Sequence, residues 1–206
     1  YPFQVGDNVL VKGDTDEITV VDGVTPGNVP GTELITGGTR AQFSSSAIKV
    51  SIASVGNGKV VAVYQSPSVG TASVGTVTGT DVSWGTPVQF SANANWPEIV
   101  SIDNDKVVVC FRDSNYGTHL AMVGTVTGTT TTWGSTSEIH ASSASWSYMA
   151  YLGNDKVIAC MEVAPGGVYA GVAKVGTVTG NSISWGSQAT FSSAQPNEPK
   201  VVYVGN

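Results

Sequence analysis

Two tryptophans in this sequence occupy matching places in a repeated pattern. Trp96 follows Phe90 by six residues, Trp146 follows His140 by six, and an earlier copy of the pattern has Lys49 at the same place. An exposed indole can stack on the apolar face of a sugar ring, while neighbouring Asn and Ser side chains bind its hydroxyls. A Trp can equally fill the space between adjacent sheets, with its N–H bonded to backbone. Both interpretations stay open, and the first makes these residues candidate ligand-binding residues.

A second candidate site is the densest group of polar and aromatic side chains in the chain. It comprises Arg112, Asp113, Asn115, Tyr116 and His119. The guanidinium of Arg112 offers a forked donor for a carboxylate, which suits an acidic or hydroxyl-rich glycan. Alternatively, Arg112 and Asp113 pair with each other and Asn115 sets a turn. We include all five in the predicted ligand-binding set, with the turn interpretation beside it.

Catalysis is not expected. Glycoside hydrolysis needs two carboxyl groups at a defined separation, and Glu98, Glu162 and Glu198 fall on different copies of the pattern. A nucleophile activated by histidine would depend on His119 or His140, and neither lies in a known nucleophile motif. The sequence therefore predicts no catalytic residues.

Metal and cofactor sites are not expected either. Asp103 to Asp105 and Asp14 to Glu17 bring oxygen ligands together, as calcium prefers, but both fall at predicted hairpin turns where Asp and Asn are common. Cys110 and Cys160 are the only cysteines, without a CxxC motif, and occupy equivalent repeat positions. Small buried apolar side chains are the expected role for both thiols.

Composition excludes several classes of protein. The 206 residues carry a net charge of −6 with only nine Lys and Arg, so a basic track for nucleic acid is absent. The longest apolar runs, such as 107–111, are about five residues against the roughly 20 needed to span a bilayer, so we expect no membrane insertion. Abundant Gly, Ser and Thr favour strands joined by tight turns over helices.

An internal repeat organises the chain. Val-Gly-Thr-Val-Thr-Gly begins at positions 74, 123 and 175, so the spacings are 49 and 52 residues. Each copy is preceded by a Lys-Val strand and followed by a Trp-Gly element, at Trp84, Trp133 and Trp185, for which we expect structural packing. Four antiparallel strands in about 50 residues match the size of one propeller blade.

The predicted fold is all-β and β-propeller-like, with about four blades of four antiparallel strands. The chain 1–206 is one repeat domain, with an N-terminal partial unit or hairpin linker at 1–42, units at 43–89, 90–139 and 140–190, and a C-terminal partial unit at 191–206. In the closure expected here, Pro199 to Val204 completes the blade begun by residues 7–43. In the alternative, Tyr1 to Val5 is that blade's own first strand, and the C-terminal strand begins a fifth unit in a longer array or an assembly of chains.

The second full unit carries a resemblance to a known group of proteins. Its stretch 106–118 reads KVVVCFRDSNYGT and is followed by the Val-Gly-Thr-Val-Thr-Gly and Trp-Gly elements. Over roughly residues 32–206 the chain resembles the tandem β-repeats of tail-fibre and other virion appendage proteins of marine bacteriophages. The other units replace the Arg-Asp-Ser-Asn of 112–115, so that set is not repeated around the ring. The resemblance implies a virion-attached, extracellular module with host-surface recognition as its role.

These observations predict a non-enzymatic phage virion appendage module that binds host-surface glycans through variable loops on one propeller face. The alternative is a purely structural capsid-decoration or fibre protein, and a glycosidase-like enzyme is a third interpretation. Expected partners are a host-surface glycan and other virion proteins or copies of the chain itself, without nucleic acid. The expected location is the virion surface or the extracellular space.

Overall fold

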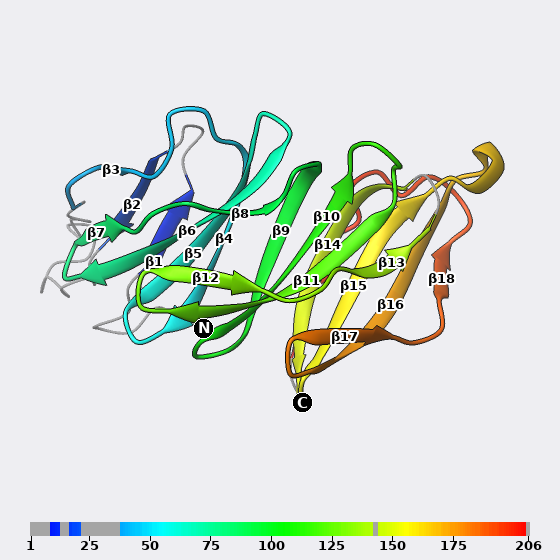
Figure 1. Ribbon diagram of the computed structural model, residues 1–206. Helices are drawn as coiled ribbons and strands as arrows, with labels where there is room; N and C mark the ends of the chain where they lie inside the picture. Colours follow the sequence, from blue (N-terminus) through cyan, green and yellow to red (C-terminus); the bar gives the residue numbers. More distant parts are fainter. Residues whose placement is uncertain (1–8, 13–16, 22–37, 142–143, 205–206) are drawn as a thin grey trace, which may run out of the picture.

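A computed structural model describes residues 9–12, 17–21, 38–141 and 144–204 of the chain. These residues form three five-stranded antiparallel sheets and a smaller three-stranded sheet (Figure 1). A 3-10 turn at Pro165–Gly167 is the only helical element in those ranges.

The bounds of the strands repeat closely from sheet to sheet. The first sheet contains β4 (Ile48–Gly56), β5 (Lys59–Ser66), β6 (Val69–Thr78), β7 (Asp81–Trp84) and β8 (Val88–Ser91); the second contains β9 (Ala94–Asp103), β10 (Lys106–Asp113), β11 (His119–Thr127), β12 (Thr130–Trp133) and β13 (Ser137–His140); the third contains β14 (Ala144–Gly153), β15 (Lys156–Val163), β16 (Ala170–Thr179), β17 (Ser182–Trp185) and β18 (Ala189–Ser192). The smaller sheet has the order β1 (Val9–Lys12), β2 (Glu17–Val21) and β3 (Ala41–Gln42).

Tight turns join the strands where the sequence places Gly, Asn and Asp. Asn57 between β4 and β5, and Asn154 between β14 and β15, adopt φ of 52° and 50°. The Thr-Gly turns after β6, β11 and β16 place their glycines at φ near 60°. Gly and Asn tolerate this left-handed region, which a two-residue hairpin turn requires. The predicted hairpins are confirmed for the described strands.

The predicted fourth strand is two strands in the structure. In the first sheet, β7 pairs with Gly75–Thr78 of β6, whereas β8 pairs with Gly70–Ala72 of the same strand. The chain leaves the ladder at residues 85–87, and the equivalent residues 134–136 and 186–188 share only the Gly that follows each Trp. Each sheet therefore has five strands rather than four, since β13 and β18 repeat this arrangement.

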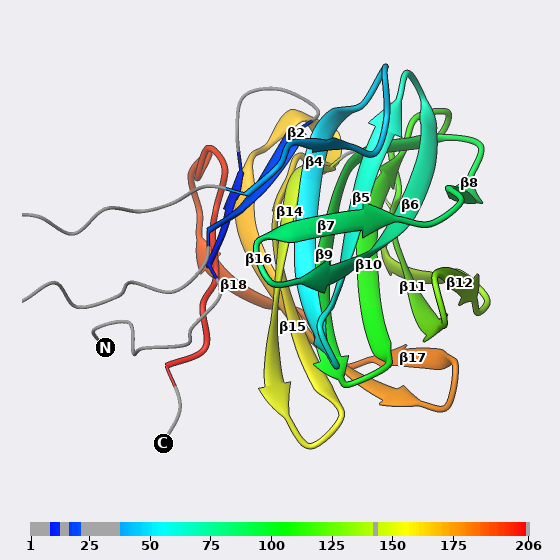
Figure 2. The ribbon, with the colours of Figure 1, turned by 90° about the vertical axis from the view of Figure 1, so that its left-hand side faces the viewer.

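The sheets pack through their inner strands and through aromatic residues. β4 contacts β9, and β9 contacts β14. Figure 2 views this packing from the side on which β2 and β7 lie. Phe90, at the end of the first sheet, lies 5.4 Å from Phe111 and 5.3 Å from Trp133 of the second sheet, measured between ring centroids. Phe43 makes the equivalent contacts with Tyr64 and Trp84 of the first sheet. The packing role predicted for these tryptophans is confirmed.

The structure confirms the all-β class and the repeated-sheet architecture. The described strands do not, however, form a closed propeller of four blades. Residues 199–204, expected to be the ring-closing strand, are not in a strand, and β2 and β3 lie against β7 of the first sheet. The alternative first strand, Tyr1 to Val5, lies outside the described residues.

Both cysteines behave as buried apolar residues. Cys110 and Cys160 are free thiols inside the sheets, at equivalent places on β10 and β15. Burial raises the pKa of the Cys110 thiol to about 12. Both thiols therefore contribute to packing, as the sequence predicted.

Candidate functional site

Each inner strand has a β-bulge at the same place in the repeat. On β9, Asn95 faces Arg112 and Glu98 faces Cys110, so three steps along β9 match two along β10. β4 and β14 show the same extra residue opposite β5 and β15. A bulge turns its side chains out of the regular alternation. The three bulges therefore aim residues of three sheets toward one region.

The residues at these bulges include two that adopt a conformation unfavourable for side chains. Lys49 has φ of 54° and Trp96 has φ of 48°, in the left-handed region. Asn197, at the same distance after Phe191 as Lys49 is after Phe43, has φ of 43°. For residues other than Gly, Asn and Asp this region costs roughly 1–2 kcal/mol.

Trp96 and Trp146 lie together at the centre of this region. Their ring centroids are 4.9 Å apart with a 43° angle between the planes. The Nζ of Lys49 lies 5.6 Å from the Trp146 ring, and the guanidinium carbon of Arg112 lies 5.7 Å from the Trp96 ring. Cations at this distance are attracted to the negative face of an indole. Side chains from β4, β9, β10 and β14 thus form one cluster.

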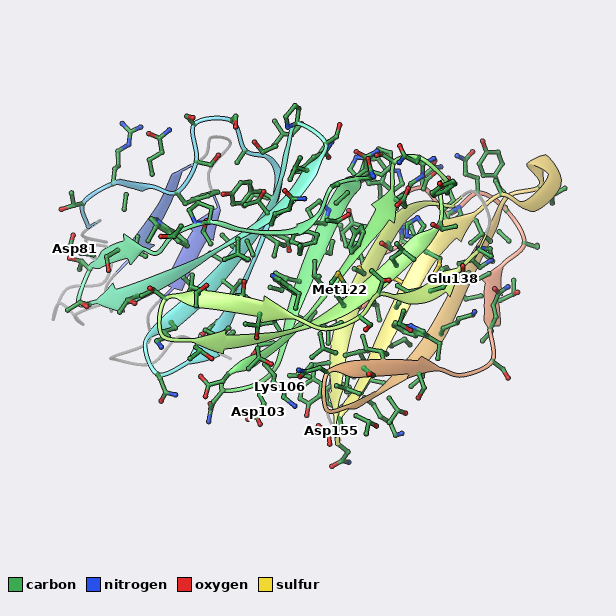
Figure 3. All side chains as sticks on the ribbon, in the orientation of Figure 1. Asp81, Asp103, Lys106, Met122, Glu138 and Asp155 are labelled. Carbon is green, nitrogen blue, oxygen red and sulfur yellow. The ribbon has the colours of Figure 1, made fainter. Side chains whose placement is uncertain are left out.

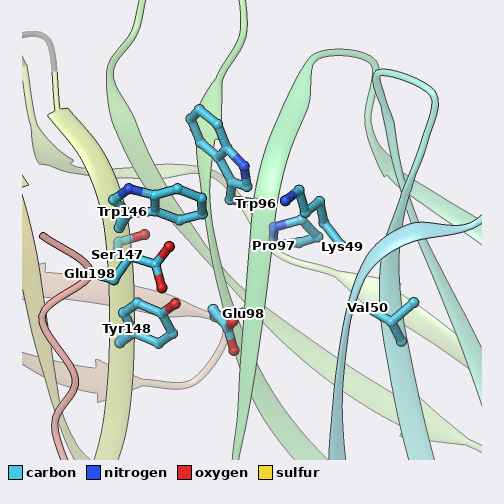
Figure 4. A pocket seen from close by; sticks show the side chains of 9 residues that line it. All are labelled: Lys49, Val50, Trp96, Pro97, Glu98, Trp146, Ser147, Tyr148 and Glu198. Atoms are coloured by element: carbon cyan, nitrogen blue, oxygen red, sulfur yellow. The ribbon is translucent and has the colours of Figure 1, made fainter. Parts of the chain in front are cut away.

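A cavity of about 220 Å³ lies beside the tryptophan pair (Figure 4). Carboxylates from distant parts of the chain, Glu98 and Glu198, both line it, together with the phenol ring of Tyr148. The remaining lining residues are Lys49, Val50, Trp96, Pro97, Trp146 and Ser147.

Two polar groups of the cavity, the carboxylate of Glu98 and the phenol of Tyr148, are set by their neighbours. The Oγ of Ser51 donates a hydrogen bond of 2.7 Å to a carboxylate oxygen of Glu98, which orients that carboxylate. Burial, followed by the negative charges of Glu98 and Glu198, raises the pKa of Tyr148. The phenol therefore remains protonated at neutral pH and can donate a hydrogen bond. Lys200 also lies over the Tyr148 ring, at 5.3 Å.

The loop after β10 is shaped largely by one carboxylate. Asp113 Oδ1 accepts hydrogen bonds from the backbone N–H groups of Asn115 (2.8 Å) and Tyr116 (3.1 Å). This is a turn held by an Asp side chain. Tyr116 is 79% exposed on that loop. Among the predicted group, Arg112 is the residue that contacts the tryptophan pair.

His119 lies apart from the surface residues with which it was grouped. It is only 1% exposed on β11, opposite His140 of β13. Strand alternation turns this side chain into the core, which spacing in the sequence alone did not indicate. The structure thus brings Trp96, Trp146 and Arg112 together and places His119 in the interior.

Seven of the nine lining residues were missed as site residues, among them Lys49, Glu98, Tyr148 and Glu198. Their repeat offsets supply the signal that identifies them. Glu98 and Tyr148 each follow the Phe90 or His140 position by eight residues, two after the tryptophans. Both offsets lie at or beside the β-bulge, and all four residues line the cavity. Extending the tryptophan comparison by two residues would have found Glu98 and Tyr148.

The third glutamate considered in the sequence has a different position. Glu162 is buried, and it accepts hydrogen bonds from the backbone N–H of Asn197 (3.2 Å) and from the side chain of Gln195 (3.4 Å). These bonds fix the C-terminal segment that carries Glu198. Glu162 therefore supports the cavity without lining it.

The Asp-rich turns lie at the other end of the molecule. Figure 3 shows Asp103 and Asp155 together at the lower end. Asp103 Oδ1 accepts the backbone N–H of Asn104 at 2.7 Å, which is a turn contact. Within the described residues, no group of three or more His, Cys, Asp and Glu side chains can hold a metal ion. Of the other calcium candidate, Asp14 to Glu17, residues 14–16 lie outside those residues.

A scan against protein-family models finds no match, and a search of curated proteins finds no relative. In the ranges that the structure describes, no helix has the length and apolar character needed to cross a membrane.

Proposed function

We propose that this protein is a non-enzymatic saccharide-binding module and that the Trp96–Trp146 cavity holds the sugar. The observation that carries the proposal is the bulge, because Lys49 and Trp96 retain a left-handed backbone while lining the same cavity. Unfavourable backbone conformations persist at sites where the side chain has a function. A glycine would be relaxed at either position, yet both positions hold large side chains.

The chemistry of the cavity suits a hydroxyl-rich ligand. Indole and phenol rings provide apolar faces for the C–H face of a sugar, while Glu98 and Glu198 accept hydrogen bonds from its hydroxyls. The volume of about 220 Å³ lies below the roughly 300–1,000 Å³ of sites for drug-sized ligands. We expect shallow binding of one sugar ring, with Arg112 and the loop after β10 contacting the next residue of the glycan.

The setting proposed for this module is a phage virion appendage at the virion surface, where the ligand is a host-surface glycan. Support comes from the division of each sheet into two ends, one with invariant Thr-Gly turns and one with bulges and loops that differ between units. Variable loops on a rigid scaffold are typical of recognition surfaces. The finer fold proposal is a propeller-like arrangement of about four units, in which β1, β2 and β3 belong to the fourth.

The test is a glycan array with the full chain, followed by calorimetry on the saccharides that bind. Trp96→Ala and Trp146→Ala should each lower the affinity at least tenfold, because each removes a stacking surface. Tyr169→Ala is the matched control, since Tyr169 is exposed but does not line the cavity. Absence of any saccharide binding, or unchanged affinity in both tryptophan variants, would overturn the proposal.

Hydrolysis is a second candidate because Glu98 and Glu198 share the cavity. Glycosidases use two carboxyl groups on either side of the scissile bond. Incubation with chromogenic glycosides of the sugars that bind should give no turnover. Turnover that disappears in Glu98→Gln and Glu198→Gln would replace the binding proposal with an enzymatic one.

A further inference from the structure

Each aromatic ring that lines the tryptophan cavity has a positively charged side chain over it. The distances from cation to ring centroid are 5.7 Å for Arg112 and Trp96, 5.6 Å for Lys49 and Trp146, and 5.3 Å for Lys200 and Tyr148. A cation within about 6 Å of an aromatic ring is attracted to the negative charge on the face of the ring. The rings of the cavity therefore already bind cations of the chain itself.

Carboxylates outnumber cations in the lining of the cavity. Of the three cations, Lys49 lines the cavity, whereas Arg112 and Lys200 lie over its rings without lining it. The lining includes the carboxylates of Glu98 and Glu198, so its side chains carry two negative charges against one positive charge. The interior therefore attracts a cationic group of a ligand more strongly than an anionic group.

The two carboxylates come close to one of the aromatic rings, that of Tyr148. Figure 4 shows the hydroxyl of Tyr148 near the carboxylates of Glu98 and Glu198. Burial, followed by the negative charges of these two glutamates, raises the pKa of Tyr148. Charges that act on the phenol act in the same way on a ligand group beside it. This end of the cavity therefore combines negative charge with an aromatic face.

Hydrogen bonds from other parts of the chain fix where both carboxylates lie. Glu98 accepts its hydrogen bond of 2.7 Å from Ser51 of β4, the strand that packs against β9. Glu198 follows Asn197, whose backbone N–H donates a hydrogen bond of 3.2 Å to the buried carboxylate of Glu162. Groups that are already held in place lose little conformational entropy when a ligand binds. The two carboxylates are thus positioned before a ligand arrives.

A protonated primary amine is the ligand group that suits this end of the cavity. An ammonium group has three N–H donors and a positive charge. Its hydrogen bonds to carboxylates join two ionised groups, which makes them shorter and stronger than bonds between neutral groups. The same group is attracted to the faces of indole and phenol rings. A hydroxyl or an acetylated amine lacks the charge, and an acidic sugar would add a third negative charge.

We propose that the saccharide in this cavity is an amino sugar, whose free, protonated amine binds between the carboxylates of Glu98 and Glu198 and against the Tyr148 ring. The inference rests on the proposed function, because it specifies the ligand of the same site. The tryptophans stack on sugar rings of any kind, whereas the two carboxylates select the amine. Lys49, the cation in the lining, weakens this selection by its charge.

The test is calorimetry on the full chain with the β-1,4-linked disaccharides of glucose, glucosamine and N-acetylglucosamine. At about pH 6, where the amine and the carboxylates are all charged, the glucosamine disaccharide should bind about tenfold more tightly than the other two, or better. Equal affinities, or binding confined to saccharides without a free amine, would overturn this inference and leave the proposed function standing. Absence of binding by these and by every saccharide of the array would overturn both.

Variants of the charged residues test which groups select the amine. Glu98→Gln and Glu198→Gln should each lower the affinity for the glucosamine disaccharide about tenfold and that for the glucose disaccharide less than about threefold, because an amide keeps the shape but loses the charge. Glu138→Gln is the matched control and should change neither affinity, since Glu138 is exposed on β13 and does not line the cavity. Equal losses for both sugars in the glutamate variants would overturn the inference.

A gain of affinity provides a test that does not depend on the folding of the glutamate variants. Lys49→Asn should raise the affinity for the glucosamine disaccharide severalfold and leave that for the glucose disaccharide nearly unchanged, because it removes a positive charge from the lining. Asn also tolerates the φ of 54° at this position. A lower or unchanged affinity for the amino sugar would contradict the placement of its amine in this cavity.

Discussion

Two aromatic clusters, six residues apart along the chain, have different surroundings. Phe90 is buried and packs against Phe111 and Trp133, with apolar neighbours. Trp96 packs against Trp146, but cations lie over both rings and a cavity lies beside them. Burial and charged neighbours, more than residue type, thus separate a cluster that stabilises the sheets from one that is available to a ligand.

The largest effect expected from this contrast is in the buried cluster. Phe90→Ala should lower the free energy of unfolding by about 3–5 kcal/mol, because it removes a buried ring and leaves a cavity between two sheets. Denaturant unfolding followed by tryptophan fluorescence measures it. Phe191→Ala is the matched variant and should cost about 1 kcal/mol or less, because that ring is 54% exposed. Equal losses in the two variants would contradict the contrast drawn here.

The opposite pattern is expected in the tryptophan pair. Trp96→Ala should lower the free energy of unfolding by only about 1 kcal/mol, since the ring is only partly buried, while lowering saccharide affinity at least tenfold, which corresponds to about 1.4 kcal/mol. Unfolding and calorimetry on the same preparation give both values. A stability loss as large as that of Phe90→Ala would show that the tryptophan pair mainly stabilises the packing of the sheets.

A smaller effect tests the bulge itself. Trp96→Gly should be more stable than Trp96→Ala by roughly 1 kcal/mol, because glycine adopts the observed φ of 48° without a steric cost. Both variants lack the ring, so their difference isolates the backbone. Ile102→Gly, in the same strand but buried and without a positive φ, should instead be strongly destabilised.

The smallest effect on stability at neutral pH is expected from the titration of Cys110. Its Sγ lies 3.5 Å from the Oγ of Ser147, which lines the cavity. Burial raises its pKa from 9.0 to about 12. The unfolded chain therefore loses this proton first as pH rises, and stability should fall between about pH 9 and 12 while remaining unchanged by this group below pH 9. Unfolding of Cys110→Ala and the wild type at pH 7 and pH 10 measures the difference. A decline that is identical in both proteins would contradict the assignment.

The repeat made much of the fold predictable. Strand positions followed from Lys-Val runs, Thr-Gly turns and Asn-containing hairpins, because these signals are local. The split of the fourth strand was missed because Val88 to Phe90 looks continuous with Val82 to Trp84, and the residues between the two strands share only the Gly that follows each Trp. Whether the ring closes could not be predicted from local sequence signals, because closure depends on how the first and last sheets are arranged in space.

The site was predictable only where repeat positions coincide with the cavity. Trp96 and Trp146 were found because they share a repeat offset. Arg112 was found because it belongs to the densest polar and aromatic group of the sequence. Glu198 could not be paired with Glu98, because their proximity arises from the C-terminal segment folding back, held by bonds to Glu162. His119 was misplaced because its direction depends on strand alternation after a loop of variable length.

The left-handed residue at the bulge also restricts which sequences this surface can adopt. Val, Ile and Thr are costly at such a φ, since branching at Cβ crowds the backbone. A library randomised at residues 49 and 96 and selected for new ligands should return Gly, Asn, Lys or aromatic residues, and rarely the branched ones that dominate the neighbouring strands. The recognition repertoire of the module would then be limited by backbone geometry before any ligand is encountered.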